Sequence, residues 1–198
     1  MNKKLAAALS GGAVLIVALT GCGGKSEGPD PKLGVWAKSV CDAVPAQDKK
    51  ISAANASIAK IASDSDLAPK DAKETYAQAF QDMSEGYKAI ADAISHAGAP
   101  PGVQDGAKRQ QDAVKNLNDL STSYADLKKK VDDLDTKDQG EFAKGLHDVA
   151  DRTKAIGRQS DSGTEALKRL EQGDVREAIA EQPSCKASGS ASAPAQAG

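Results

Sequence analysis

The sequence predicts an all-α protein: an antiparallel up-and-down bundle of about four long helices plus short C-terminal helices, closed by one disulfide. Three observations lead to this prediction. Apolar residues recur at alternating steps of four and three along three segments, which is the spacing of a helix face. No window alternates apolar and polar residues as a strand would. Polar or glycine- and proline-rich breaks separate the segments, and short turns between long helices make neighbours antiparallel.

The first helical stretch of the body has the weakest apolar stripe. Pro45 interrupts it, and a proline inside a helix removes a backbone donor, so we expect one kinked helix or two short ones. The acidic run from Ser63 to Asp66 separates this stretch from the next. The stripe consists of Leu33, Trp36, Val40, Val44, Ile51, Ile58 and Ile61.

The second stretch runs from Pro69 to Ala97. Proline suits the first turn of a helix, because the backbone N–H that it lacks would have no hydrogen-bond partner within the helix there. Residues Gly98 to Gly102 (GAPPG) then stop the helix and make a turn. The apolar stripe consists of Tyr76, Phe80, Met83, Tyr87, Ile90, Ile94 and Ala97.

The third and fourth stretches complete the bundle. The third runs from Val103 to Leu134, which is about 48 Å of helix. The fourth carries a stripe from Phe142 to Ile156. Residues 162–165 and 174–177 resemble capping boxes, so we expect each to open a short helix. Residues 186–198 are low in complexity, and we expect this tail to be disordered.

The N-terminus has the pattern of an export signal. Lys3 and Lys4 precede an apolar stretch from Leu5 to Leu19, which is short for a membrane span and typical of a signal peptide. The stretch ends in a motif that resembles the bacterial lipobox, made of Leu19, Thr20, Gly21 and Cys22. The resemblance implies removal of residues 1–21 and a diacylglyceryl thioether on Cys22. An ordinary signal peptide with an incidental cysteine is the alternative.

This anchor predicts where the protein is located. Two acyl chains hold a protein far better than one, so we expect an extracytoplasmic protein on the outer face of the cell membrane. Residues 22–32 then form a flexible tether reaching about 17 Å, and residues 33–185 form the bundle domain. Removing the signal leaves 24 basic and 28 acidic residues, a net charge of −4. Such a chain has no basic excess for binding nucleic acid.

Cysteine usage predicts how the bundle is closed. With Cys22 committed to lipid, Cys41 and Cys185 remain, and export would place both in an oxidising compartment. Four antiparallel helices return the chain to its starting end, and the short final helices bring Cys185 towards Cys41. The bond would be worth up to about 5 kcal/mol in the chain-entropy model. Two free thiols or an intermolecular bond are the alternatives.

The sequence contains no recognisable catalytic motif. Residues 140–145 have the glycine spacing of a phosphate loop, but Leu146 stands where lysine is required. Asp133, Asp135 and Asp138 loosely resemble a calcium-binding loop, but Lys137 stands at the third ligand position, so the EF-hand pattern fails. His96 and His147 lack partners at ligand spacing. We therefore predict a protein that is not an enzyme and has no cofactor and no metal site.

Two features of the helical stripes have competing interpretations. Tyr76, Met83, Tyr87 and Tyr124 could line a ligand cavity, although such residues at helical spacing usually form core. The run from Lys128 to Lys130 could bind an anionic surface, although its flanking acidic residues favour a solvated helix face.

Several features together resemble the small secreted lipoproteins of actinobacteria. These are the lipobox, the helical body rich in Ala, Asp and Lys, Trp36 shortly before Cys41 (VWAKSVCDAV), and Cys185 just ahead of a small-residue tail. That family carries no defined activity, so the resemblance implies no catalytic residues. We expect a non-catalytic lipoprotein that binds or scaffolds an envelope protein or a cell-wall partner. The alternative is a small-ligand carrier or accessory binding protein with a cavity between helices.

Overall fold

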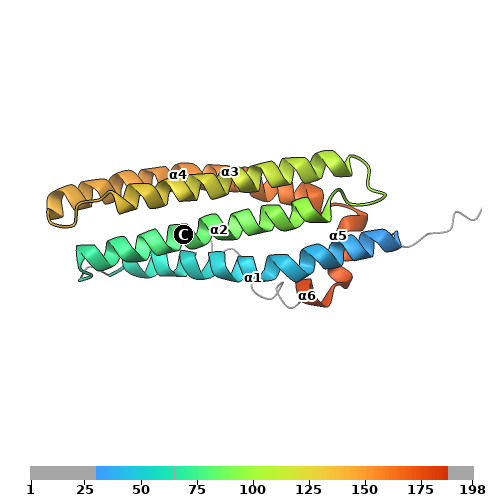
Figure 1. Cartoon of the computed structure of the whole chain (residues 1–198), viewed down its shortest axis with the longest axis horizontal. Coiled ribbons are helices and arrows are strands. Elements are labelled where there is room, and N and C mark those ends of the chain that lie inside the picture. The colour runs from blue at the N-terminus through green and yellow to red at the C-terminus, as the bar shows by residue number, and fades with distance from the viewer. Residues whose placement is uncertain (1–29, 65, 187–198) are drawn as a thin grey trace, which may run out of the picture.

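The computed structural model describes residues 30–64 and 66–186, and every regular element in this part of the chain is a helix. The long helices α1 to α4 lie side by side in an elongated bundle, and the short helices α5 and α6 lie beside α1 (Figure 1). The predicted all-α bundle is confirmed. The helices are α1 (Pro31–Ala62), α2 (Pro69–Ala97), α3 (Gly106–Asp132), α4 (Gln139–Leu170), α5 (Asp174–Glu181) and α6 (Pro183–Lys186).

The helices pack in chain order. α1 lies against α2, α2 against α3, and α3 against α4, as an up-and-down bundle requires. The chain is joined back to α1 by α5 and α6, which contact α1 and each other. We call the end where α1 begins and α5 lies the clasp end, and the end with the α1–α2 and α3–α4 connections the tip (Figure 1). No helix within the described residues is both long and apolar enough to cross a bilayer.

α1 is a single helix that continues through Pro45. It begins at Pro31, so the last two residues assigned to the tether belong to the helix. Asp30 accounts for this earlier start, because its carboxylate accepts a hydrogen bond of 2.9 Å from the backbone N–H of Lys32. At the other end of the body, α6 includes Lys186.

α2 has the predicted bounds, but α3 is shorter than predicted. It begins at Gly106 instead of Val103, ends at Asp132 instead of Leu134, and contains 27 residues. The preceding residues form turns, in which Val103 N–H donates to the carbonyl of Pro100 and Gly106 N–H to that of Val103. Asp105 has a φ of 57° and therefore cannot continue a right-handed helix.

α4 is longer than predicted, and the capping box at residues 162–165 is wrong. These residues lie inside one helix that continues to Leu170. Gly163 is buried there, and a Cβ atom on it would lie 3.0 Å from Leu120 of α3, so close helix packing explains the glycine. The helix expected at Asp174 is confirmed as α5, although Gly173, with a φ of 66°, is its N-cap.

The core of the clasp end gathers side chains from α1 to α5. Trp36 is buried in this core, and its indole N–H donates a hydrogen bond of 2.8 Å to the carbonyl of Gly98. This bond joins the start of α1 to the end of α2. The cluster includes Leu33, Trp36, Ala37, Val40, Ile51, Ile90, Ala91, Ile94, Ala113, Leu117, Leu170, Val175 and Ala178.

The half of the bundle nearer the tip has a second core cluster, and a glycine lies between the two. Gly86 of α2 faces Ile51 of α1, and a Cβ atom on it would lie 2.7 Å from Ile51 Cγ1. The two helices approach closely at this point because the glycine has no side chain. The second cluster consists of Ala54, Ala79, Phe80, Met83, Leu120, Tyr124, Leu127, Val131, Val149 and Ile156.

This contact predicts opposite effects for two glycine substitutions. Gly157→Ala should raise the free energy of unfolding by up to about 1 kcal/mol, because its Cβ would meet no atom within 4 Å and alanine favours a helix. Gly86→Ala gains the same helix propensity but overpacks Ile51, so we expect it to be about 1–3 kcal/mol less stable than Gly157→Ala. Urea unfolding of both variants measures the difference. Equal stabilities would contradict the close approach of α1 and α2.

Candidate functional site

The predicted lipidation motif lies outside the described residues. Leu19, Thr20, Gly21 and Cys22 all precede Asp30, where the described part of the chain begins. The body contributes three other candidate features, which are the disulfide, the cluster of aromatic rings and a groove between two helices.

Cys41 and Cys185 form the predicted disulfide, with Cα atoms 5.1 Å apart and 144 residues between them in sequence. Cys41 lies on the buried face of α1, and Cys185 lies on α6. The bond therefore attaches the last helix covalently to the first.

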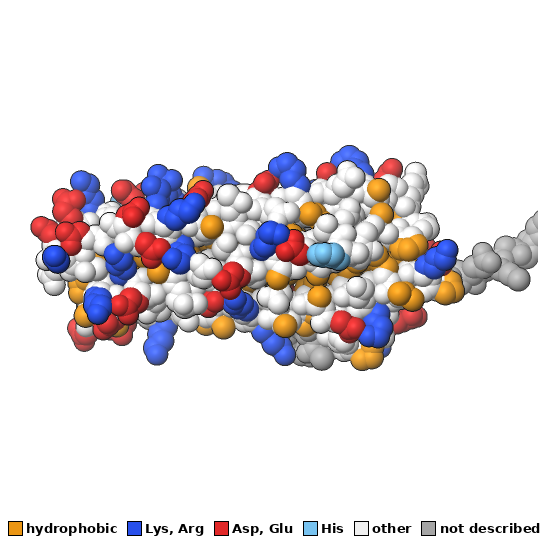
Figure 2. Space-filling model, in the orientation of Figure 1, with side chains coloured by type: hydrophobic (Ala, Val, Ile, Leu, Met, Phe, Trp, Pro, Cys, Tyr) orange, Lys and Arg blue, Asp and Glu red, His pale blue; other side chains and the backbone are white. Residues whose placement is uncertain are grey.

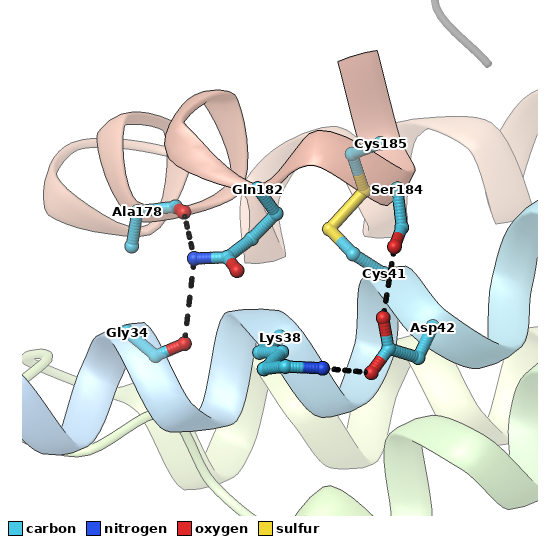
Figure 3. The surroundings of a disulfide bond; sticks show 8 residues. All are labelled: Gly34, Lys38, Cys41, Asp42, Ala178, Gln182, Ser184 and Cys185. Atoms are coloured by element: carbon cyan, nitrogen blue, oxygen red, sulfur yellow. Dashed lines mark hydrogen bonds and ion pairs between the residues drawn. A yellow bond between two sulfur atoms is a disulfide. The ribbon is translucent and has the colours of Figure 1, made fainter. Parts of the chain in front are cut away.

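Polar contacts flank this disulfide on both sides (Figure 3). The Gln182 side-chain amide donates a long hydrogen bond of 3.5 Å to the carbonyl of Gly34. The Ser184 hydroxyl donates one of 2.8 Å to Asp42, which also accepts one from Lys38. The hydrogen bond from Lys38, followed by that from Ser184, lowers the pKa of the Asp42 carboxyl. These contacts hold α5 and α6 along the first turns of α1.

The four residues predicted to line a ligand cavity lie together between α2 and α3. Tyr76 stacks on Phe80 with ring centroids 6.1 Å apart, and Phe80 lies 6.2 Å from Tyr124. Tyr124 stacks in turn on Tyr87 at 5.6 Å. Met83 is buried in the same cluster, with 2% of its surface exposed. The rings pack against one another in the favoured range of centroid distances, as in a core.

Burial changes the acidity of these tyrosines. Loss of solvation raises the pKa of Tyr124 to about 12, and neighbouring Tyr87 adds to the effect. Burial also raises the pKa of Tyr87 and of Tyr76. All three phenols are therefore neutral at physiological pH.

An open groove of about 290 Å³ lies between α3 and α4. Its volume is close to the lower end for small-molecule sites. Lys130 and Arg152 contribute positive charge from opposite helices, and neither forms an ion pair within the described residues. Asp126, the acidic residue of the groove, is paired with Lys129 at 3.1 Å. The lining consists of Ser123, Asp126, Leu127, Lys130, Arg152, Ala155, Ile156 and Gln159.

Sequence reasoning missed this groove. Lys130 belongs to a lysine run whose acidic neighbours favour a solvated helix face, and Arg152 belongs to no motif. The stripe of the third stretch passes through Val131 and that of the fourth through Thr153. Lys130 and Arg152 directly precede these two positions, so periodicity places both cations at the edge of a helix face. The pairing of α3 with α4 brings them to one site, and no local pattern encodes that pairing.

The remaining candidates are ordinary surface residues. Lys128 pairs with Asp132 at 2.6 Å, as a solvated helix face would. His147 is exposed beside Asp151, and His96 Nδ1 lies 2.6 Å from the carbonyl oxygen of Asp92. Within residues 30–64 and 66–186, no three His, Cys, Asp or Glu side chains are grouped as metal ligands.

Comparison of the chain with protein-family models, curated proteins and solved structures finds no match. The interpretation of these features therefore depends on the residues and their geometry.

The buried phenol of Tyr124 predicts a specific pH dependence of stability. Its pKa is higher in the folded chain than the value of 10.0 expected when unfolded, so its contribution is complete below pH 10 and is lost as the pH rises towards 12. Between pH 9 and 12 the free energy of unfolding of the wild type should fall by about 2–3 kcal/mol more than that of Tyr124→Phe. Urea unfolding across this range measures both. Parallel pH profiles would contradict the burial of the hydroxyl.

Proposed function

We propose that the protein is an extracytoplasmic lipoprotein, anchored by lipidated Cys22 to the outer face of the cell membrane. Its helical body is a non-catalytic module that binds or scaffolds an envelope protein or a cell-wall partner. The observation that carries this proposal is the Cys41–Cys185 disulfide, because such bonds persist in oxidising compartments. The export signal and lipobox that end at Cys22 would deliver the chain to such a compartment.

Two properties of the body support a scaffolding role. Stacked rings and apolar side chains occupy the space between its long helices. Many of its surface charges pair within one helix, as Lys108 does with Asp112 and Lys115 with Asp119. Exposed pairs of this kind contribute little to stability, but charged residues of both signs keep an elongated body soluble. These features support a role in which the surface meets a partner.

Replacing the lipidated cysteine tests the anchor. Cys22→Ala should move the protein from the membrane fraction into the medium, because it removes the sulfur that carries the diacylglyceryl group. Thr20→Ala is the matched control, since it keeps a small residue in the lipobox and should leave the protein on the membrane. Fractionation and the mass of the N-terminal peptide report the outcome. Unchanged membrane retention of Cys22→Ala would contradict the proposal.

The groove between α3 and α4 favours a second candidate function, that of a small-ligand carrier. Leu127 and Ile156 form an apolar floor beside the cations Lys130 and Arg152. This combination suits a small molecule with an apolar part and a carboxylate or phosphate group.

Thermal-shift assays with metabolites and cell-wall fragments test the carrier function. A ligand should raise the Tm of the wild type but not that of a Lys130→Gln/Arg152→Gln variant. Lys115→Gln, an exposed change elsewhere on α3, should keep the full shift. No shift across the panel would count against a carrier.

A further inference from the structure

The two ends of the bundle differ in chemistry. The α2–α3 connection at the clasp end has no charged residue from Gly98 to Gln104, and Asp105 ends it. The connections at the tip are acidic and include Asp64, Asp66, Asp133, Asp135 and Asp138. Figure 2 shows hydrophobic side chains gathered towards the clasp end on the face in view, and charged side chains crowded towards the tip.

The clasp end also carries the exposed apolar surface of the body. Val35, near the start of α1, is 72% exposed and is the one large hydrophobic side chain so exposed among the described residues. Pro101 and Val103, in the α2–α3 connection, are partly exposed. Val35 and the uncharged residues 98–104 thus add apolar surface to an end that also carries the carboxylates of Asp30 and Asp105.

The position of the anchor in the sequence limits where this end can lie. The eight residue steps from Cys22 to Asp30 span at most about 28 Å. The 29 residues of α2 extend for about 43 Å between the clasp end and the tip. A lipid on Cys22 therefore keeps the clasp end near the bilayer, while an upright bundle places the tip far from it.

We propose that the clasp end rests against the outer surface of the bilayer and that the tip is held away from it. This inference rests on the proposed lipidation of Cys22. Contact with the headgroup region removes Val35 and the α2–α3 connection from water. A bundle lying flat would bring the tip, with its aspartates and Lys137, to the lipid as well.

This orientation decides which surfaces a partner can reach. The α3–α4 groove lies in the half of the bundle nearer the tip, because its residues come from the second half of α3 and the first two thirds of α4. It therefore remains open to molecules outside the membrane, as does the tip.

Site-specific labelling of the full-length lipidated protein tests the orientation. Gln104→Cys at the clasp end, and Asp64→Cys and Lys137→Cys at the tip, each add one thiol at an exposed position. Each is labelled with an environment-sensitive fluorophore in phosphatidylcholine–phosphatidylglycerol vesicles that contain a lipid with a nitroxide headgroup. We expect quenching at residue 104 to exceed that at residues 64 and 137 at least threefold. Equal quenching at either tip position, or none at residue 104, would overturn the orientation.

Flotation of the same vesicles and the mass of the N-terminal peptide separate the two proposals. A chain that carries the diacylglyceryl group and floats, but is quenched at the tip, contradicts the orientation and leaves the lipoprotein function standing. A chain without lipid on Cys22 contradicts the proposed function, and the orientation is overturned with it.

Discussion

The structure depends on one constraint, which is that the end of the chain must be joined back to its first helix. Short connections pack α1 to α4 in order, but they do not close the bundle. α5 and α6 close it by lying along α1, where Val175 and Ala178 are fully buried and Cys185 is bonded to Cys41. Pro45 cannot donate to the carbonyl of Cys41, one helical turn earlier. The disulfide therefore attaches to α1 at a turn that lacks one of its helical hydrogen bonds.

Small residues make the rest of this packing work. Ala37, Ala91 and Ala113 are fully buried. Gly86 and Gly163 allow close approach of helices, since a Cβ atom would lie 2.7 Å from Ile51 at the first position and 3.0 Å from Leu120 at the second. The large side chains of the core are Trp36 at the clasp end and the cluster of aromatic rings in the half nearer the tip. Side chains thus fill the interior along its length. Recognition, by a partner or by a small anionic molecule, takes place on the surface under either proposed function.

Packing, more than charge, determines how the helices are aligned. Most ion pairs join residues of one helix, and Lys50 of α1, which meets Asp82 and Glu85 of α2, is the exception among the described residues. Hydrogen bonds such as those between Ser84 and Ser121 add a few polar contacts between helices. Because most surface charges pair within their own helix, they place few constraints on how neighbouring helices are aligned.

The sequence by itself determined the helical class, the bounds of α2 and the two cysteines that pair. Periodicity and capping signals are local, and the antiparallel topology brings both cysteines to one end. The proposed lipidation of Cys22 likewise rests on a local motif, residues 19–22. The local pattern around Gly163 indicated the start of a new helix. Only the tertiary structure decided that α4 continues through this residue, because the glycine permits close contact with Leu120 of α3. It also decided that the tyrosines stack as core, and that Lys130 and Arg152 share a groove. The residues of one helix determine which of its faces is apolar. Which residues of a neighbouring helix that face contacts depends on the register between the two helices. Close packing along the whole interface sets this register.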